Sequence, residues 1–323
     1  MSLQPDSTST VDAAQTVPPT TDAPAPFNKP TADLILRSSD GMNFRVRKAF
    51  LAEASPVFED MFTLPAPQNP AGSLPVVPMT EDSRTLEGLL RLCYPASEMP
   101  LRTLDQAVTL LDAAKKYAMD SALNFLGERL VSFAERSPIQ VYAIAVRHQL
   151  PDKVIKAALN ACLNLIAPTA KLKRVVDFQH ISASAYLSFL DYRDRCAVAI
   201  DVSVFGDSTW IDSNRWCWLT CTNDLCQVHV THGPVTFKDN IYKSPRAWWF
   251  QLHMSCCRNG LRSRPCGKAL ELIFFNYAAA ALSEAAKCSH CGPRSVADLE
   301  EFMVILVAKI DDVVAQVETD IVW

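Results

Sequence analysis

The sequence lacks the long hydrophobic segment that a membrane-spanning protein needs. Although 49% of its residues are apolar, no uninterrupted run reaches the ~18–20 apolar residues that cross a bilayer. No signal peptide opens the chain, and no Asn-x-Ser/Thr acceptor for N-glycosylation occurs. These absences argue against a membrane partner and against secretion. They predict an intracellular protein, located in the cytoplasm or the nucleus.

The local signatures of enzyme active sites are also missing. The patterns Gly-x-Ser-x-Gly, His-Glu-x-x-His and Gly-x-Gly-x-x-Gly do not occur, so nothing marks a hydrolase, a metalloprotease or a dinucleotide-binding enzyme. The chain has only six histidines, and none belongs to a catalytic motif. We therefore expect a non-enzymatic protein without catalytic or cofactor-binding residues.

The chain has no excess of positive charge: its 31 basic and 35 acidic residues give a net charge of -4. Binding to nucleic acid depends on cations that replace the counterions of phosphate, so this total argues against a nucleic-acid partner. One local cluster is an exception: Arg258, Arg262, Arg264 and Lys268 follow the aromatic residues 248–250. In such a cluster, the aromatic rings could stack on bases and the basic side chains could pair with phosphate groups. The interpretation that the acidic total favours is a solvated basic loop beside a tryptophan core.

With 323 residues, the chain is long enough for two domains, each with its own core. Residues 1–30 are rich in Ser, Thr, Pro, Asp and Ala and have almost no large apolar side chains. Such a segment cannot bury enough surface to offset the entropy of ordering. We therefore predict a disordered N-terminal tail over residues 1–30.

The first structured segment is a predicted hairpin followed by a helix. Residues 32–36 and 42–46 alternate apolar and polar side chains around a Ser-Ser-Asp-Gly turn at 38–41, as two paired strands would. Ser55 can then cap a helix in which Pro56 occupies the first position, where its missing N–H costs nothing. Several large apolar side chains of this helix fall on one face.

This stretch resembles the BTB (POZ) domain, a protein-interaction fold. In order, the matching segments are residues 33–36, 44–46, 47–51, 55–62, 74–77, 89–94 and 110–117. The resemblance implies an α+β domain over residues 31–135, with a small sheet flanked by helices. It also implies protein partners: a second copy in a homodimer, or a cullin if the chain is an adaptor of a ubiquitin ligase. Candidate contact residues are apolar side chains whose helical spacing equally fits the core, namely Phe58, Met61, Phe62, Met79 and Tyr94.

Residues 136–323 have the pattern of a mainly α-helical C-terminal domain. Its first helix pairs, from Ser137 and from Pro151, resemble the helical extension that follows BTB domains in cullin adaptors. A Trp/Cys-rich subregion covers residues 210–292 and holds every tryptophan except Trp323. This composition is similar to that of fungal BTB proteins with Trp- and Cys-rich C-terminal regions. Ser295 and Asp298 predict the capped start of a last, long amphipathic helix that packs on the same chain.

The eleven cysteines favour reduced thiols or metal ligands over a disulfide framework, because their number is odd and the chain has no secretion signal. Cys221 and Cys226 form one close pair, and Cys288 and Cys291 form a second, Gly-ended pair. Two such pairs would supply the four ligands of a structural zinc ion. Cys217, His229 and His232 are alternative partners for the second pair. The competing interpretation is that these cysteines are small buried hydrophobic residues.

These observations predict a non-enzymatic protein-interaction module in which the BTB domain dimerises or acts as an adaptor and the C-terminal domain holds a target. The alternative is a zinc-stabilised nucleic-acid or chromatin-associated regulator that uses the BTB domain only to dimerise. A zinc requirement together with salt-dependent DNA binding would favour the alternative.

Overall fold

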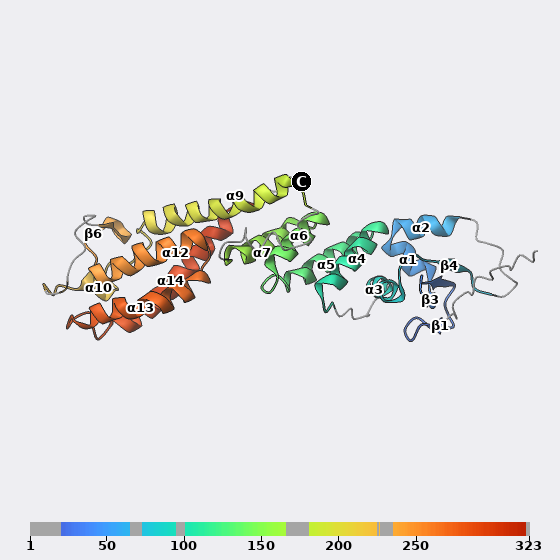
Figure 1. Cartoon of the computed structure of the whole chain (residues 1–323), viewed down its shortest axis with the longest axis horizontal. Helices are drawn as coiled ribbons and strands as arrows, with labels where there is room; N and C mark the ends of the chain where they lie inside the picture. The colour runs from blue at the N-terminus through green and yellow to red at the C-terminus, as the bar shows by residue number, and fades with distance from the viewer. Residues whose placement is uncertain are drawn as a thin grey trace, which may run out of the picture. The chain divides into compact units, whose positions relative to one another are not determined.

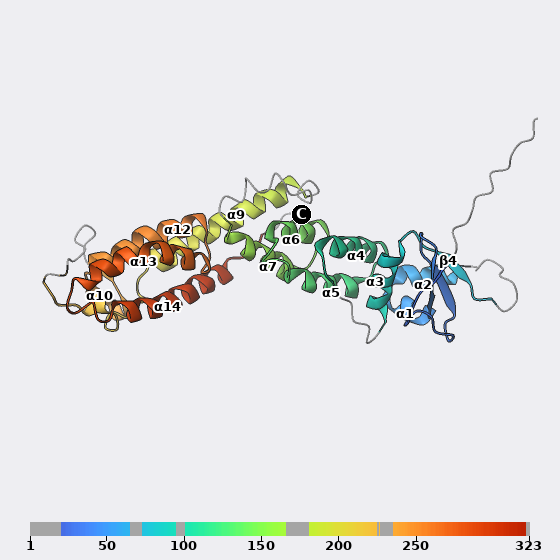
Figure 2. The same cartoon turned by 60° about the horizontal axis from the view of Figure 1, so that its bottom comes forward.

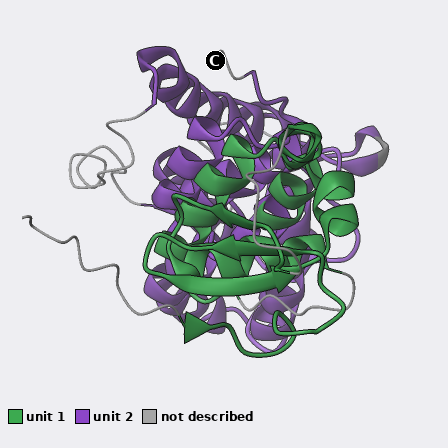
Figure 3. Cartoon of the chain, turned by 90° about the vertical axis from the view of Figure 1, so that its right-hand side faces the viewer, with its two compact units in different colours: residues 1–126 green, residues 127–323 purple. Residues whose placement is uncertain are grey.

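The computed structural model describes residues 21–64, 73–94, 101–165, 181–224, 226 and 235–320. The chain divides into two compact units, residues 1–126 and residues 127–323, which are coloured separately in Figure 3. The first unit contains a small sheet with helices, and the second is mostly helical. Among the described helices, none combines the length and the apolar character needed to cross a bilayer.

Unit 1 is built on a mixed sheet with the strand order β1-β3-β2-β4. The predicted hairpin is confirmed: β2 (Leu34–Arg37) pairs antiparallel with β3 (Met42–Val46). β1 (Thr21–Asp22) lies parallel to β3, and β4 (Val76–Pro78) lies parallel to β2. Alternate side chains of β2 and β3 are buried, so one face of the sheet packs against the helices of the unit.

The hairpin turn is held by a glycine and an aspartate. Gly41 has a φ of 89°, a left-handed conformation that favours glycine, and its N–H donates to the carbonyl of Ser38 over 3.0 Å. Asp40 accepts from the hydroxyl of Ser38 at 2.5 Å and from the hydroxyl of Ser83 at 2.6 Å. These two hydrogen bonds lower the pKa of Asp40 below its ordinary value. The turn is thereby tied to the start of the helix that follows β4.

Side chains cap several helices of unit 1, and the predicted helix start at Ser55 is confirmed. The Ser55 hydroxyl accepts from the Phe58 N–H at 3.1 Å and donates to the Tyr117 carbonyl at 2.5 Å. It therefore caps its helix and fixes it to a second one. Thr103 caps the later helix by accepting from the Gln106 N–H. The helices are α1 (Lys48–Ala54), α2 (Pro56–Thr63), α3 (Ser83–Cys93), α4 (Leu104–Lys116) and α5 (Asp120–Val131), which crosses into the second unit.

The prediction of a disordered tail over residues 1–30 is wrong for residues 21–30, and residues 1–20 lie outside the described part. The Ala23 N–H donates to the Asn43 carbonyl at 2.9 Å, beside the β1–β3 pairing. Phe27 is buried, and its ring lies 5.4 Å from that of Tyr94 in an edge-on arrangement. A single aromatic side chain and main-chain pairing therefore order a segment whose average composition predicted disorder.

The described part of unit 2 consists of helices with two short strands, and its helices can be followed in Figures 1 and 2. The predicted helix pair from Ser137 and Pro151 is present as α6 (Pro138–Arg147) and α7 (Asp152–Leu163). Its remaining elements are α9 (Ala183–Ile200), η2 (Asp201–Gly206), α10 (Cys217–Thr220), β5 (Val235–Thr236), η3 (Lys238–Asn240), β6 (Tyr242–Lys243), α11 (Ala247–Phe250), η4 (Gln251–Cys257), α12 (Arg258–Ser263), α13 (Ala269–Ala286) and α14 (Ser295–Gln316). Helices α13 and α14 lie side by side in both views and contact one another.

The last helix, α14, packs against α9 and α13 of the same chain, as its apolar stripe predicts. Leu299, Phe302, Leu306 and Ile310 are buried along this stripe. The predicted cap is wrong, because α14 begins at Ser295 itself and no side chain caps it. The carboxylate of Asp298, in the first turn, instead accepts from the backbone N–H of Cys217 at 2.7 Å. The start of α14 is therefore fastened to the Trp/Cys-rich subregion.

Candidate metal centre

The second cysteine pair forms a tight knuckle just after α13. The Gly292 N–H donates to the Cys288 carbonyl at 2.8 Å, and the Cys291 N–H points at the Cys288 sulfur over 3.5 Å. A Cβ atom at Gly292 would lie 3.0 Å from the Cys288 carbonyl oxygen, so a larger residue would crowd the turn. The N–H aimed at sulfur favours the thiolate form of Cys288, the form that binds metal.

The first cysteine pair follows α10 and is held by a buried arginine. The Cys226 N–H donates to the Asn223 carbonyl at 3.0 Å and closes the turn between the two cysteines. The guanidinium of Arg246 donates to the Cys226 carbonyl at 2.7 Å and also to the Cys221 carbonyl. Arg246 is 7% exposed, so its forked donor group fixes both halves of the knuckle from inside the fold. This residue was missed by the sequence analysis, because a single arginine after a proline carries no metal-site signal.

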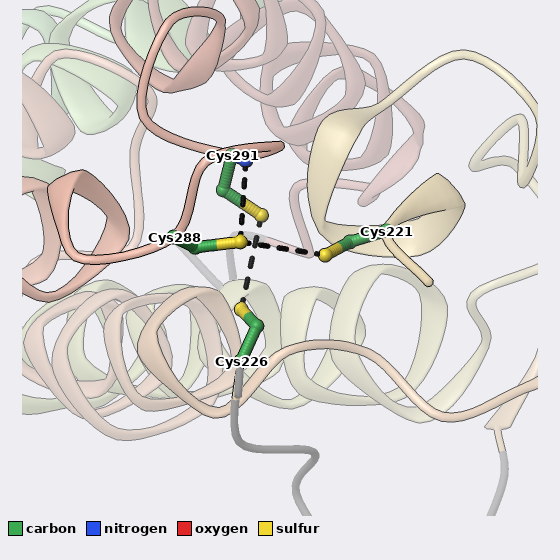
Figure 4. A group of neighbouring side chains, drawn as sticks. All are labelled: Cys221, Cys226, Cys288 and Cys291. Carbon is green, nitrogen blue, oxygen red and sulfur yellow. Dashed lines mark hydrogen bonds between the residues drawn. The ribbon is translucent and has the colours of Figure 1, made fainter. Parts of the chain in front are cut away.

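The two pairs meet in space and point toward one another (Figure 4). The sulfur atoms of Cys221, Cys226, Cys288 and Cys291 all lie within 4.8 Å of one another, and all four residues are buried. The Cys221–Cys288 and Cys226–Cys291 sulfur distances are 3.6 and 3.9 Å. Four sulfurs each ~2.3 Å from a central zinc would be about 3.8 Å apart. The cluster therefore has the size of a tetrahedral metal site, and its cysteines are free thiols.

The protonation of the cluster is set by burial and by hydrogen bonds. Burial alone would raise the pKa of Cys288, but the N–H groups of Cys291 and His290 and its sulfur neighbours lower that pKa to about 7. Burial raises the pKa of Cys226 to about 11, and it raises the pKa of Cys291 as well. Of these three thiols, Cys288 is the one that ionises most readily.

Of the alternative ligands, Cys217 stays outside the cluster. Its thiol is buried, and burial together with the Asp298 carboxylate raises its pKa to about 12, which keeps it protonated. Its backbone contacts the cluster, where the Cys217 carbonyl accepts from the Cys291 sulfur at 3.7 Å. His229 and His232 lie outside the described residues.

An aromatic core supports the knuckles from the α14 side. Trp216 and Trp218 stack with ring centroids 5.3 Å apart, and Trp218 and Trp249 stack at 5.4 Å. The ring of Phe302, on α14, stands edge-on to these three indoles at 5.4 to 5.6 Å. The three tryptophans lie within residues 210–292, the stretch predicted to form a Trp/Cys-rich subregion. His253, which the sequence analysis left unassigned, lies against Trp249 in the same core.

The basic cluster predicted after residues 248–250 is largely occupied by internal contacts. Arg258 forms a two-pronged ion pair with Asp201, at 2.5 and 2.7 Å, and Arg262 approaches the same carboxylate at 3.8 Å. Arg264 donates to the carbonyl oxygen of Asn164 at 2.9 Å. The three arginine side chains therefore connect separate elements of unit 2 to one another.

The candidate contact residues of unit 1 fall into two groups. Phe58 and Met79 are buried, and the ring of Phe58 stacks on Tyr117 at 4.7 Å. Met61, Phe62 and Tyr94 are half-buried. The Tyr94 hydroxyl accepts from the Arg47 N–H at 2.8 Å, which holds the start of α1. Phe58 and Met79 therefore pack the core, while the half-buried residues retain surface that a partner could contact.

Comparison with known proteins agrees with this description of the first unit. Residues 26–133 match the BTB/POZ domain family. A solved structure, the BTB domain of zebrafish PATZ1, is 28% identical over 30% of this chain and 73% of that chain, with a TM-score of 0.25. No curated protein matches the chain, so the similarity to fungal proteins stays a prediction. Residues 26–133 are therefore a BTB/POZ domain, a protein-interaction fold, and a mostly helical region follows it.

Proposed function

We propose that this chain is a non-enzymatic interaction protein whose BTB/POZ domain binds a second copy of the chain or a cullin and whose C-terminal region holds a target. The observation that carries the proposal is the BTB/POZ match at residues 26–133, which coincides with a small mixed sheet and its helices. In this proposal, a structural zinc ion held by the four-cysteine cluster keeps the C-terminal region folded.

An apolar stripe on α2 supports a partner surface on unit 1. Val57 is 37% exposed and Leu64, at the end of the helix, is 67% exposed. Met61 is half-buried and lies between them at helical spacing. Exposed apolar side chains on one helix face are the usual means by which a helix contacts a protein partner.

Light scattering on the full chain tests self-association directly. We expect a dimer, and we expect Met61→Asp to shift it toward the monomer because the change places a charge in the contact. Val304→Asp is the matched control, since Val304 is 70% exposed on α14 and lies in the other unit. A pull-down with purified cullin tests the adaptor role. A wild-type monomer that also ignores cullin would overturn the proposed function.

The zinc assignment rests on the chemistry of the donor set. Four buried cysteine sulfurs with tetrahedral spacing suit zinc, and four protein ligands leave no open position for water. The ion would thus stabilise the fold and supply no hydrolytic chemistry. Metal analysis of the purified chain should find one zinc per chain. Cys226→Ser should lose it, whereas Cys256→Ser, a change outside the cluster, should keep it.

A zinc-stabilised nucleic-acid regulator is the competing proposal. The pairing of Arg258 and Arg262 with Asp201 reduces the free positive charge of the basic cluster, and this supports protein binding instead. A DNA titration at several salt concentrations separates the two. Tight binding with a steep loss at higher salt, together with stoichiometric zinc, would favour the regulator.

A further inference from the structure

A second site lies in unit 2, apart from the cysteine cluster. It is a cavity of about 400 Å³, within the ~300–1,000 Å³ range of small-molecule pockets. Aromatic side chains form much of its wall: Phe205, Phe237, Trp249 and Phe250. The wall also includes His253.

Two unusual helical segments line this cavity. η2 (Asp201–Gly206) and η4 (Gln251–Cys257) are both π-helical, a conformation that is rare and is often found at functional sites. Phe205 of the first segment and His253 of the second both reach the cavity. The ion pair between Asp201, at the start of η2, and Arg258, just after η4, connects the two segments. The fold therefore holds two widened helical turns against one cavity.

His253 has unused hydrogen-bonding capacity. It is 2% exposed, and neither ring nitrogen has a hydrogen-bond partner in the described part of the chain. Its ring stacks on Trp249 at 4.7 Å and lies 4.9 Å from the ring of Phe205. Burial lowers the pKa of His253 to about 3, so the imidazole is neutral at pH 7 and offers one donor and one acceptor. A buried polar group without a partner is costly, which a native fold accepts where a ligand supplies the partner.

We propose that this cavity binds a small, uncharged aromatic molecule whose hydroxyl or ring N–H group forms a hydrogen bond with His253. The aromatic walls provide stacking surface. The charge of Arg258, the cation in the lining, is already balanced by Asp201, so the site offers little attraction to an anion. The cavity lies outside the BTB domain, and none of the four cluster cysteines lines it.

Three related probes test the proposal on the full wild-type chain: 2-naphthol, naphthalene and 2-naphthoate. Isothermal titration and thermal unfolding report binding. We expect 2-naphthol to raise the melting temperature and to bind about tenfold or more tightly than naphthalene, a difference of about 1.4 kcal/mol. 2-Naphthoate should bind more weakly than 2-naphthol. Equal affinity for 2-naphthol and naphthalene, stronger binding of 2-naphthoate, or no binding of 2-naphthol would overturn the proposal and leave a water-filled cavity.

A ring-preserving variant gives an independent readout. His253→Phe keeps an aromatic ring against Trp249 and removes the two unpaired nitrogens. The melting temperature of the free protein should therefore stay the same or rise, while the preference for 2-naphthol over naphthalene disappears. Phe275→Ala, an 81% exposed position on α13, should change neither property. Retained preference in His253→Phe would refute the role of His253; if that variant does not fold, the three wild-type titrations decide alone.

Discussion

Replacing Arg246 with methionine should destabilise unit 2 far more than the same change at an exposed arginine. Arg246 is 7% exposed and donates to the carbonyls of both Cys221 and Cys226. Hydrogen bonds from a charged group contribute ~1.5–3 kcal/mol each. Methionine retains the packing of the aliphatic stem but leaves both carbonyl oxygens unpaired. We therefore expect the free energy of unfolding to fall by about 3–5 kcal/mol.

Urea unfolding followed by tryptophan fluorescence measures this loss. All the tryptophans of the chain lie in unit 2, so the signal reports that unit alone. With a urea slope of ~2 kcal/mol per molar, the midpoint should move by about 1.5–2.5 M. Because Arg246 orients two of the cluster cysteines, zinc affinity in a chelator competition should also fall, by about 10- to 100-fold.

Arg215→Met is the matched control for this prediction. Arg215 is an exposed arginine that pairs with Glu301 and lies over the ring of Trp216 at 4.8 Å. Its loss should cost about 1 kcal/mol or less, the usual contribution of a surface pair. Arg246→Lys should fall between the two, because an ammonium group cannot reproduce the fork of two donors. A midpoint shift below about 0.5 M in Arg246→Met, or one equal to that of the control, would refute the reasoning.

Removing zinc with a strong chelator should lower the melting temperature reported by tryptophan fluorescence, and added zinc should restore it; an unchanged melting temperature would argue against a structural metal. Burial of Glu81 raises its pKa, but hydrogen bonds from Lys116 and Tyr117 lower that pKa by more. The net result is a pKa below the ordinary value of 4.5. The stabilisation that ionised Glu81 gives the folded state is therefore present above pH 4.5 and is lost as the pH falls through the lowered pKa. Glu81→Gln should remove this pH dependence, so that the unfolding free energy of unit 1, followed by circular dichroism, changes less in acid. Phe58→Ala should cost about 3–5 kcal/mol of unfolding free energy by the same method, and a cost below about 1 kcal/mol would contradict its place in the core.

The features that the sequence predicts correctly are those with local causes. The hairpin depends on alternation and on a Gly41 turn, and the start of α2 depends on Ser55 and Pro56, all within a few residues of one another. The cysteine pairs are local as well, because each knuckle closes through its own backbone. Their meeting is not local. The sequence leaves Cys217, His229 and His232 as alternative partners of the second pair. In the fold, α13 and α14 pack beside the aromatic core, and the four cysteines of the two predicted pairs are the ones that meet.

The features that sequence reasoning missed depend on what packs around a residue. Phe27 stands alone in a Pro-rich segment, and its burial follows from the ring of Tyr94, which comes from a distant helix end. The π-helical segments were missed because pattern analysis assumes a period of 3.6 residues. Neither His253 nor Arg246 belongs to a sequence motif. Both side chains are buried without an ion pair to any described residue, and this environment, which the neighbouring sequence does not reveal, gives them their roles.

The charge of Arg246 gives an independent reason to regard the four cysteines as a metal site. Its guanidinium is buried, and in the described part of the chain no carboxylate forms an ion pair with it. A buried cation without a counter-charge is strongly unfavourable. Thiols that stay protonated would leave that cation uncompensated, whereas four thiolates around a zinc ion would carry a net charge of about -2 beside it. The burial of Arg246 is therefore most readily explained if the cysteines are ionised, and a buried cluster of thiolates is stable when it holds a metal cation.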